Sequence, residues 1–395
     1  MGARDAVITG IGLVSCLGEG PDAHWDALSR GGPFPVQTEG FAPYAVHPLV
    51  KLDLDRQIPK RGDQRQMEAW QRIGTYAAGL ALEQAGVKGN ADLLARTDMI
   101  VAATGGERDT AVDASILATL PKAANPGAFL NEKLMADLRP TLFLAQLSNL
   151  LAGNISIVHG VVGSSRSFLG EEGAGGDAVR VACARIEAGQ SELALVGGAC
   201  NAERPDLLLT DAMGGVGMLW HGDGAPPPVW ARQDQGGGMV LGSVGAFLVI
   251  ESRAHAEARG AHILARIAGV QTDRCRREPG QATENARRQL DRLMALGRPD
   301  GVISAATGAA PGTAEEAAFL RSLGLPYRAV ATALGSSLEA SFFAAAAIAA
   351  IALTHGALPP PAELAEPAYA GPLRQVLVTG WGHWRSEAMA LVAAE

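Results

Sequence analysis

The chain of 395 residues has few aromatic side chains, few cysteines and no excess of basic charge. Phe, Trp and Tyr make up 5% of it, so small residues, including 49 glycines, must supply much of the packing. Its formal net charge of −8 argues against nucleic acid as a partner, because no basic surplus is present to neutralise phosphates. The length exceeds that of a usual single core, which predicts one large layered α/β domain or two fused halves.

Metal-binding and membrane-spanning patterns are missing as well. The cysteines, Cys16, Cys183, Cys200 and Cys275, lie far apart and lack the spacing of a metal site, so we expect neither a metal nor a cofactor. No signal peptide is evident at the start, which favours a reducing cytoplasm. The apolar run Ala344–Leu353 is too short for a membrane span and predicts a buried helix.

A short repeat is the clearest internal pattern. The sequence RTDMIVAATG (Arg96–Gly105) recurs as RPDGVISAATG (Arg298–Gly308), and each copy is typical of an apolar strand that runs into a Thr-Gly turn. A similar order of expected strands surrounds each copy. The repeat therefore predicts two equivalent halves, residues 1–255, with an excursion at 106–150, and residues 256–395.

Ten apolar strands are expected, five in each half, with helical stretches between them. Near-continuous apolar strands that alternate with helices indicate mixed sheets covered by helices on both faces. The first half offers Ala6–Gly12, Met99–Ala103, the stretch before Glu172, Leu193–Gly198 and Ala246–Glu251, and the second offers Ile263–Val270, Gly301–Ala306, Tyr327–Leu334, Gln375–Gly382 and Ala388–Ala394. We predict that the two sheets pack around central helices.

The segment after Glu172 predicts one of these helices. Val179, Cys183 and Ile186 are spaced at i, i+4 and i+7 and form a single apolar face. Cys183 is therefore interpreted as a small core residue rather than a displaced nucleophile.

Three longer blocks follow one another in an informative order. They are AVITGIGLVSCLGEGPDAHWDALSRG near the start, NLLAGNISIVHGVVG (Asn149–Gly163) and GGGMVLGSVGAFLVIESRAHAEARGA (Gly236–Ala261). Together they resemble the β-ketoacyl-[acyl-carrier-protein] synthases of the elongating type, and the resemblance covers nearly the whole chain. It implies a thiolase-like duplicated α/β fold with the layers α-β-α-β-α.

The catalytic residues of that family do not carry over. The resemblance puts Glu172 at the position of the nucleophilic cysteine, and a carboxylate cannot form the required thioester. The two family histidines fall on Ala306 or Thr307 and on Ser336, while the family lysine falls on Ala331. These side chains offer at most one weak donor to a developing oxyanion. Loss of condensing activity is therefore expected, with Glu172 as a general base as the alternative.

The turn GWGHWRS (Gly380–Ser386) stands where the family has a Phe that gates the acyl pocket, and His383 takes the gating position. Trp381, His383 and Trp384 are predicted to narrow or close the entrance, because large side chains replace small glycines. His383 has two interpretations, as a plug or as an acid, base or ligand contact at the pocket mouth.

The resemblance implies work in fatty acid or polyketide biosynthesis as the silent member of a ketosynthase pair, of the chain-length-factor type. Two alternatives stay open: a decarboxylase or residual acyltransferase acting on malonyl- or acyl-carrier protein, and a homodimeric acyl-carrier scaffold. The expected partners are an active ketosynthase in a heterodimer or a second copy in a homodimer, with acyl carrier protein as a further partner. The short strand around Gly163–Leu169 is predicted to pair across the two-fold axis.

Overall fold

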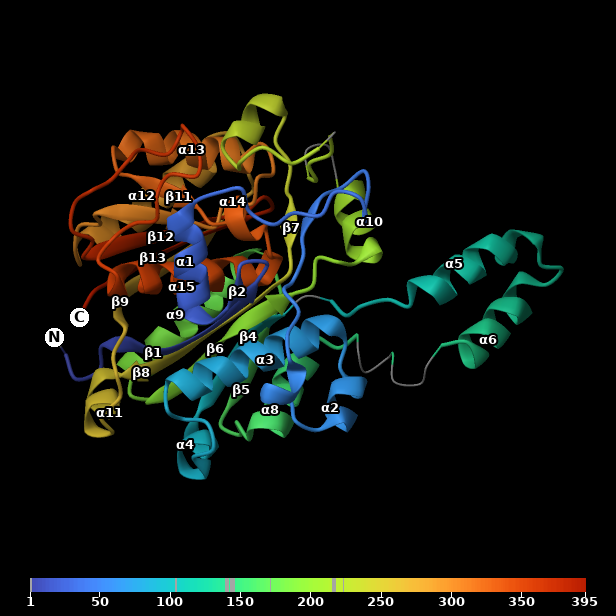
Figure 1. Cartoon of the computed structure of the whole chain (residues 1–395), viewed down its shortest axis with the longest axis horizontal. Coiled ribbons are helices and arrows are strands. Elements are labelled where there is room, and N and C mark those ends of the chain that lie inside the picture. The colour runs from blue at the N-terminus through green and yellow to red at the C-terminus, as the bar shows by residue number, and fades with distance from the viewer. Residues whose placement is uncertain are drawn as a thin grey trace.

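A computed structural model describes residues 2–103, 105–138, 142, 146–170, 172–214, 218–222 and 224–395 (Figure 1). The strands of the first half are β1 (Ala6–Ser15), β4 (Asp98–Ala103), β5 (Ser165–Phe168), β6 (Leu193–Cys200) and β8 (Val244–Ser252). Those of the second are β9 (Ala265–Arg274), β10 (Gly301–Ser304), β11 (Tyr327–Ala329), β12 (Gln375–Trp381) and β13 (Ser386–Ala393). The described residues also form the two-residue strands β2 (Gly18–Glu19), β3 (Val46–His47) and β7 (Leu241–Gly242).

The two halves have the same strand order. The first half runs β5-β4-β6-β8-β1 and the second runs β11-β10-β12-β13-β9. Numbered by appearance within each half, both are 3-2-4-5-1, so β4 and β10, the strands of the sequence repeat, occupy equivalent places. The predicted duplication is confirmed in this way, although Thr104 of the first copy lies outside the described residues.

The expected pair of sheets is joined into one. Ala6, Val7 and Ile8 of β1 pair antiparallel with Ile267, Arg266 and Ala265 of β9. Both strands would otherwise be sheet edges with unpaired backbone groups, and the pairing satisfies those groups. The predicted division between residues 255 and 256 falls within α11 (Arg253–Ala258), which connects β8 to β9.

Helices fill three layers around the strands. The longer ones are α1 (Gly20–Arg30), α3 (Ala69–Gln84), α5 (Thr110–Thr119), α6 (Pro126–Ala136), α8 (Leu150–His159), α9 (Glu172–Glu187), α10 (Pro205–Met213), α12 (Gln281–Met294), α13 (Gly312–Leu323) and α15 (Ser341–Thr354). The shorter ones are α2 (Arg61–Gln66), α4 (Ala91–Arg96) and α14 (Ala331–Leu334).

Alternating residues of each strand face different helix layers. In β4, Ile100 packs against the central helices α9 and α15, whereas Val101 packs against α3 and α8. In β12, Val378 faces the central layer and Leu377 faces α12 and α13. The layers therefore follow the predicted order α-β-α-β-α, which is visible in Figure 1 around the central α9 and α15.

The central helix α15 and the apolar face of α9 are buried, as their sequences predict. Every residue of α15 from Phe342 to Leu353 is buried, and Val179, Cys183 and Ile186 of α9 are at most 5% exposed. A helix that is apolar on all sides is stable only inside a core, which explains why α15 lies between the sheets. In the described part of the chain no helix is long and apolar enough to cross a membrane.

One predicted strand is shorter than expected, and the excursion is helical. The predicted strand Tyr327–Leu334 ends at Ala329, and Ala331–Leu334 turns into α14, ending at Gly335 with a φ of 76°. Alanine and leucine favour a helical turn, and glycine readily adopts the positive φ that ends it. The described part of the 106–150 excursion forms α5 and α6, which project away from the body in Figure 1.

Candidate functional site

The family nucleophile position lies at the start of the central helix α9. Glu172 is the first residue of this helix, and its side chain lies outside the described part of the structure. A Cβ added at the next residue, Gly173, would lie 2.2 Å from Ser386 Oγ at the start of β13. The beginning of α9 is therefore in close contact with the end of the β12–β13 turn, which the sequence predicted as the gate.

The positions of the two histidines and the lysine hold small, buried side chains. Ala306 is 0% exposed, Thr307 2%, Ala331 4% and Ser336 1%. Thr307 Oγ1 accepts a hydrogen bond from the backbone amide of Ala309 at 3.2 Å. These residues pack the interior, and within the described structure none presents a charged or imidazole group to a substrate.

Ser336 is held by the backbone of the strand beside it. Its amide donates to Val240 O at 2.8 Å, its carbonyl accepts from Gly242 N at 2.8 Å, and its hydroxyl lies 3.9 Å from Met239 Sδ. A Cβ on Gly242 would lie 1.8 Å from Leu334 O, so the two segments approach as closely as glycine permits. Ser336 is thereby fixed at a buried position beside β7.

Of the three predicted gate residues, two lie in the turn and one lies in the core. Trp381 is 2% exposed and packs against Phe319 of α13, with ring centroids 5.5 Å apart. Trp384 is 43% exposed, and its ring centroid lies 5.3 Å from that of His383. A Cβ on Gly312 would lie 3.1 Å from Gly382 O, so the start of α13 closes against this turn.

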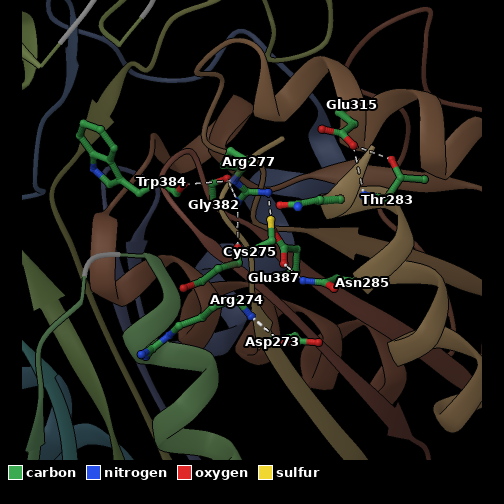
Figure 2. Close-up of polar contacts among 12 residues, drawn as sticks. Asp273, Arg274, Cys275, Arg277, Thr283, Asn285, Glu315, Gly382, Trp384 and Glu387 are labelled. Carbon is green, nitrogen blue, oxygen red and sulfur yellow. Dashed lines mark hydrogen bonds and ion pairs between the residues drawn. The ribbon is translucent and has the colours of Figure 1, made fainter. Parts of the chain in front are cut away.

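Arg277 fixes the turn in place (Figure 2). Its guanidinium donates to the carbonyl of Gly382, to Trp384 O at 3.2 Å and to Ser386 O at 3.2 Å, and it pairs with the carboxylate of Glu387. Arg277 adopts a φ of 62°, a left-handed conformation that costs a non-glycine residue about 1–2 kcal/mol. The contacts of the guanidinium offset that strain and hold the turn in this conformation.

Glu387 is the buried centre of the contacts drawn in Figure 2. It is 1% exposed, accepts from Asn285 Nδ2 at 3.0 Å, and lies 3.5 Å from Cys275 Sγ. Burial raises the pKa of this carboxyl, and the positive charge of Arg277 opposes that shift. Sequence reasoning missed this cluster; the signal was a glutamate within the apolar strand SEAMALVA, which calls for a buried cation.

Replacing Arg277 should open the turn and destabilise the protein. We expect Arg277→Ala to lower the free energy of unfolding by about 3 kcal/mol, because Glu387 would be left buried without its cation. Amide exchange of residues 382–386 should accelerate by roughly tenfold or more. The matched control is Arg276→Ala, an exposed neighbour, for which a change within about 0.5 kcal/mol is expected. Equal urea unfolding curves for the two variants would contradict the role given to Arg277.

A second buried carboxyl lies beneath the loop that carries Ala306. Glu316 of α13 is 0% exposed and accepts hydrogen bonds from Ser304 Oγ at 2.8 Å and Thr379 Oγ1 at 2.6 Å. Burial raises its pKa from 4.5 to about 7, because the two hydroxyls and the more distant Arg277 offset only part of the lost hydration.

Glu316 should therefore make the fold less stable as pH rises. The folded state holds the proton more tightly than the unfolded state, so stability should fall between pH 4.5 and 7 and then level off. Glu316→Gln should remove this dependence and stabilise the protein at pH 8 by on the order of 1–3 kcal/mol. Urea unfolding of both proteins from pH 4 to 8 measures the effect; parallel curves at all pH values would contradict it.

The cysteines do not supply a substitute nucleophile. Burial raises the pKa of Cys16 and Cys183 to about 12 and that of Cys200 further, so these thiols stay protonated and unreactive at neutral pH. Cys275, which is partly exposed, also has a raised pKa, first from burial. Among the described residues, no group of three or more His, Cys, Asp or Glu side chains is placed to hold a metal ion.

Comparison with known proteins places the chain in a family. Residues 3–256 match the model of the β-ketoacyl synthase N-terminal domain, and the chain belongs to the β-ketoacyl synthase family. It is 27% identical over 285 residues to 3-oxoacyl-[acyl-carrier-protein] synthase 2 of Vibrio cholerae, a match covering 68% of this chain and 63% of that relative. The chain thus spans less than two thirds of the length of that relative.

Longer matches come from a polyketide relative and from a solved structure. The oxytetracycline polyketide β-ketoacyl synthase 1 of Streptomyces rimosus is 27% identical over 393 residues, covering 92% of this chain and 88% of that protein. The ishigamide ketosynthase/chain length factor superposes with a TM-score of 0.80 at 21% identity, covering 99% of both chains. At that identity the superposition establishes the thiolase-like fold and nothing finer.

Proposed function

We propose that this chain is a catalytically silent ketosynthase homologue that assists an active ketosynthase in fatty acid or polyketide biosynthesis. The observation that carries the proposal is the set of buried, uncharged side chains at the positions of the family's two histidines and lysine. Condensation requires an activated thiolate and donors aimed at a developing oxyanion. Neither requirement is met by Ala306, Thr307, Ala331 and Ser336, together with a glutamate at the cysteine position.

The contacts that hold the turn between β12 and β13 in place support the same proposal. An active synthase must admit a flexible carrier arm to the start of its nucleophile helix. Here Ser386 touches the start of α9, and Arg277 holds the Gly382–Trp384 turn against α13. Large side chains at Trp384 and Arg385 replace the small glycines that would let such a turn move. The role that fits is that of a wall or support for a partner's acyl chain.

A surface suited to a partner subunit surrounds β5. This strand ends the sheet and is hydrogen-bonded only to β4 among the described strands. Large apolar side chains next to it in sequence are exposed, with Ile157 at 69%, Val162 at 62% and Leu169 at 60%. A partially exposed sheet edge flanked by apolar side chains favours pairing with another chain. We propose an active ketosynthase as the natural occupant, with a second copy in its absence.

Co-expression with an intact ketosynthase from the same source tests the proposal. A tag on this chain should retain the untagged synthase through size exclusion as a one-to-one complex, and light scattering gives its mass. Acyl carrier protein loaded with an acyl group should then bind the complex. If the chain stays a homodimer beside its intact neighbour, and itself releases carbon dioxide from malonyl-carrier protein, the decarboxylase replaces the silent partner as the proposed function.

A further inference from the structure

Arg232 is a buried cation without a counter-ion in the described part of the chain. It lies in the 3-10 turn Ala231–Gln235 and is 2% exposed. Its Nε and Nη2 atoms are buried and have no hydrogen-bond partner among the described residues. Isolated buried charges cost several kcal/mol, so natural proteins pair them or place them where a ligand does so.

The carboxylate of Glu363, whose charge acts on Arg232, is already engaged elsewhere. Burial lowers the pKa of Arg232 to about 10, and the negative charge of Glu363 opposes only part of that shift. Both oxygens of Glu363 accept backbone amides, from Trp230 at 3.1 Å and Ala231 at 2.9 Å, so this carboxylate caps the turn rather than the guanidinium. The guanidinium can lie close to Gly308 because glycine has no side chain: a Cβ at that residue would be 2.8 Å from Arg232 Nη2.

Arg232 is one of the residues that line a cavity of about 170 Å³. Such a cavity is much larger than the 10–15 Å³ or so that one water requires. Among the described residues the lining includes no carboxylate; it consists of Gly32, Pro33, Phe34, Val36, His47, Ala225, Pro226, Pro227, Pro228, Arg232, Ala331, Thr332 and Ala362. The described walls are thus largely apolar, and Arg232 is the cation that they contain.

Two other polar side chains reach this cavity. Burial lowers the pKa of His47 to about 4, so its ring is neutral, and Nδ1 donates to Pro35 O at 2.7 Å. Thr332 Oγ1 accepts from Val229 N at 3.2 Å, which leaves its hydroxyl proton available to a ligand. Arg232 and Thr332 can therefore both donate to one acceptor group in the cavity.

We propose that this cavity binds a small monocarboxylate with a short apolar body. A guanidinium binds a carboxylate through two parallel hydrogen bonds. One cation beside a neutral imidazole matches a single negative charge better than the double charge of a phosphate ester. The proline and phenylalanine walls suit an alkyl or aromatic body. The site is independent of the proposed pairing with a ketosynthase.

The test compares hexanoate with neutral and doubly charged probes. Calorimetry of the full chain should detect hexanoate binding, with hexanamide and inorganic phosphate each bound at least roughly tenfold more weakly. Arg232→Met should weaken hexanoate binding by on the order of tenfold or more. The control Arg321→Gln changes an exposed arginine that lines a neighbouring pocket and should leave hexanoate affinity unchanged.

Thermal melting provides a second readout without added ligand. Since Arg232→Met removes an unpaired buried charge, its Tm should equal or exceed that of the native chain, and hexanoate should no longer raise it. Hexanoate binding that survives Arg232→Met overturns the proposal, as does preference for phosphate. Asp223 precedes Ala225 by two residues in the sequence. If Asp223→Asn binds hexanoate and the native chain does not, Arg232 is paired internally and the proposal is wrong.

Discussion

The purified chain should form no covalent adduct when incubated with an acyl-loaded carrier protein, and Glu172→Cys should not restore condensation. The new thiol would stand at the start of α9, but the donors for the oxyanion would still be absent, since Ala306, Thr307 and Ser336 are buried and uncharged. Losing a single oxyanion donor costs about 10²–10³ in rate. Turnover by Glu172→Cys should therefore stay at least ~10³-fold below that of an intact synthase.

Intact-protein mass spectrometry and product analysis decide this prediction. An authentic synthase assayed in parallel is the positive control, and Glu172→Gln is the matched control because it preserves the size of the side chain. A stable acyl mass on the native chain would contradict the account. So would condensation by Glu172→Cys within tenfold of the synthase, because the missing histidines would then be dispensable.

Leu169→Asp should dissociate the dimer or heterodimer. Leu169 follows the edge strand β5 and is 60% exposed in the single chain. An obligate interface across this edge should bury more than ~2,000 Å². Burying a leucine contributes about 1.5–3 kcal/mol, and an aspartate there adds an uncompensated charge. The dissociation constant should rise by on the order of 100-fold or more, measured by sedimentation.

Stability of the isolated subunit separates this effect from misfolding. Since Leu169 is exposed in the single chain, Leu169→Asp should leave its urea unfolding midpoint nearly unchanged. Leu364→Asp is the control, because Leu364 is a fully exposed leucine outside the proposed interface. Unchanged association of Leu169→Asp, or equal effects of the two variants, would place the interface elsewhere.

The sequence was sufficient to predict the strands and the central helices, for physical reasons. An all-apolar segment such as Phe342–Leu353 is stable only between layers, and the spacing of Val179, Cys183 and Ile186 defines one helical face. The alternation of side chains along β12 could also have predicted which way Trp381 faces. Val376 and Val378 of β12 face the central helices, so Leu377 and Trp381 must face the outer helices. We assigned Trp381 to the gate without taking this two-residue alternation into account.

The contact between Arg277 and Glu387 at the β12–β13 turn could not be predicted from the local sequence pattern. Arg277 and Glu387 are 110 positions apart, and neither position has a periodic neighbour that predicts the other. Their contact depends on the β9–β13 pairing, which aligns Arg274 with Ser386 and so brings Arg277 to the turn. Likewise, Arg232 is an arginine in a polar segment, and only the tertiary packing shows that it is buried. Residue type predicts such sites poorly because burial of charge is a property of the fold.

Reconstitution with an intact ketosynthase whose own cysteine is replaced by alanine tests catalytic silence most directly. The mixture contains this chain, the altered synthase, acyl carrier protein and malonyl and acyl groups, and mass spectrometry of the carrier-bound products is the measurement. We expect no elongated product from this mixture, and full product when the synthase cysteine is restored, with a yield or chain length that depends on the presence of this chain. Elongated product from the cysteine-free mixture would show that this chain itself catalyses condensation.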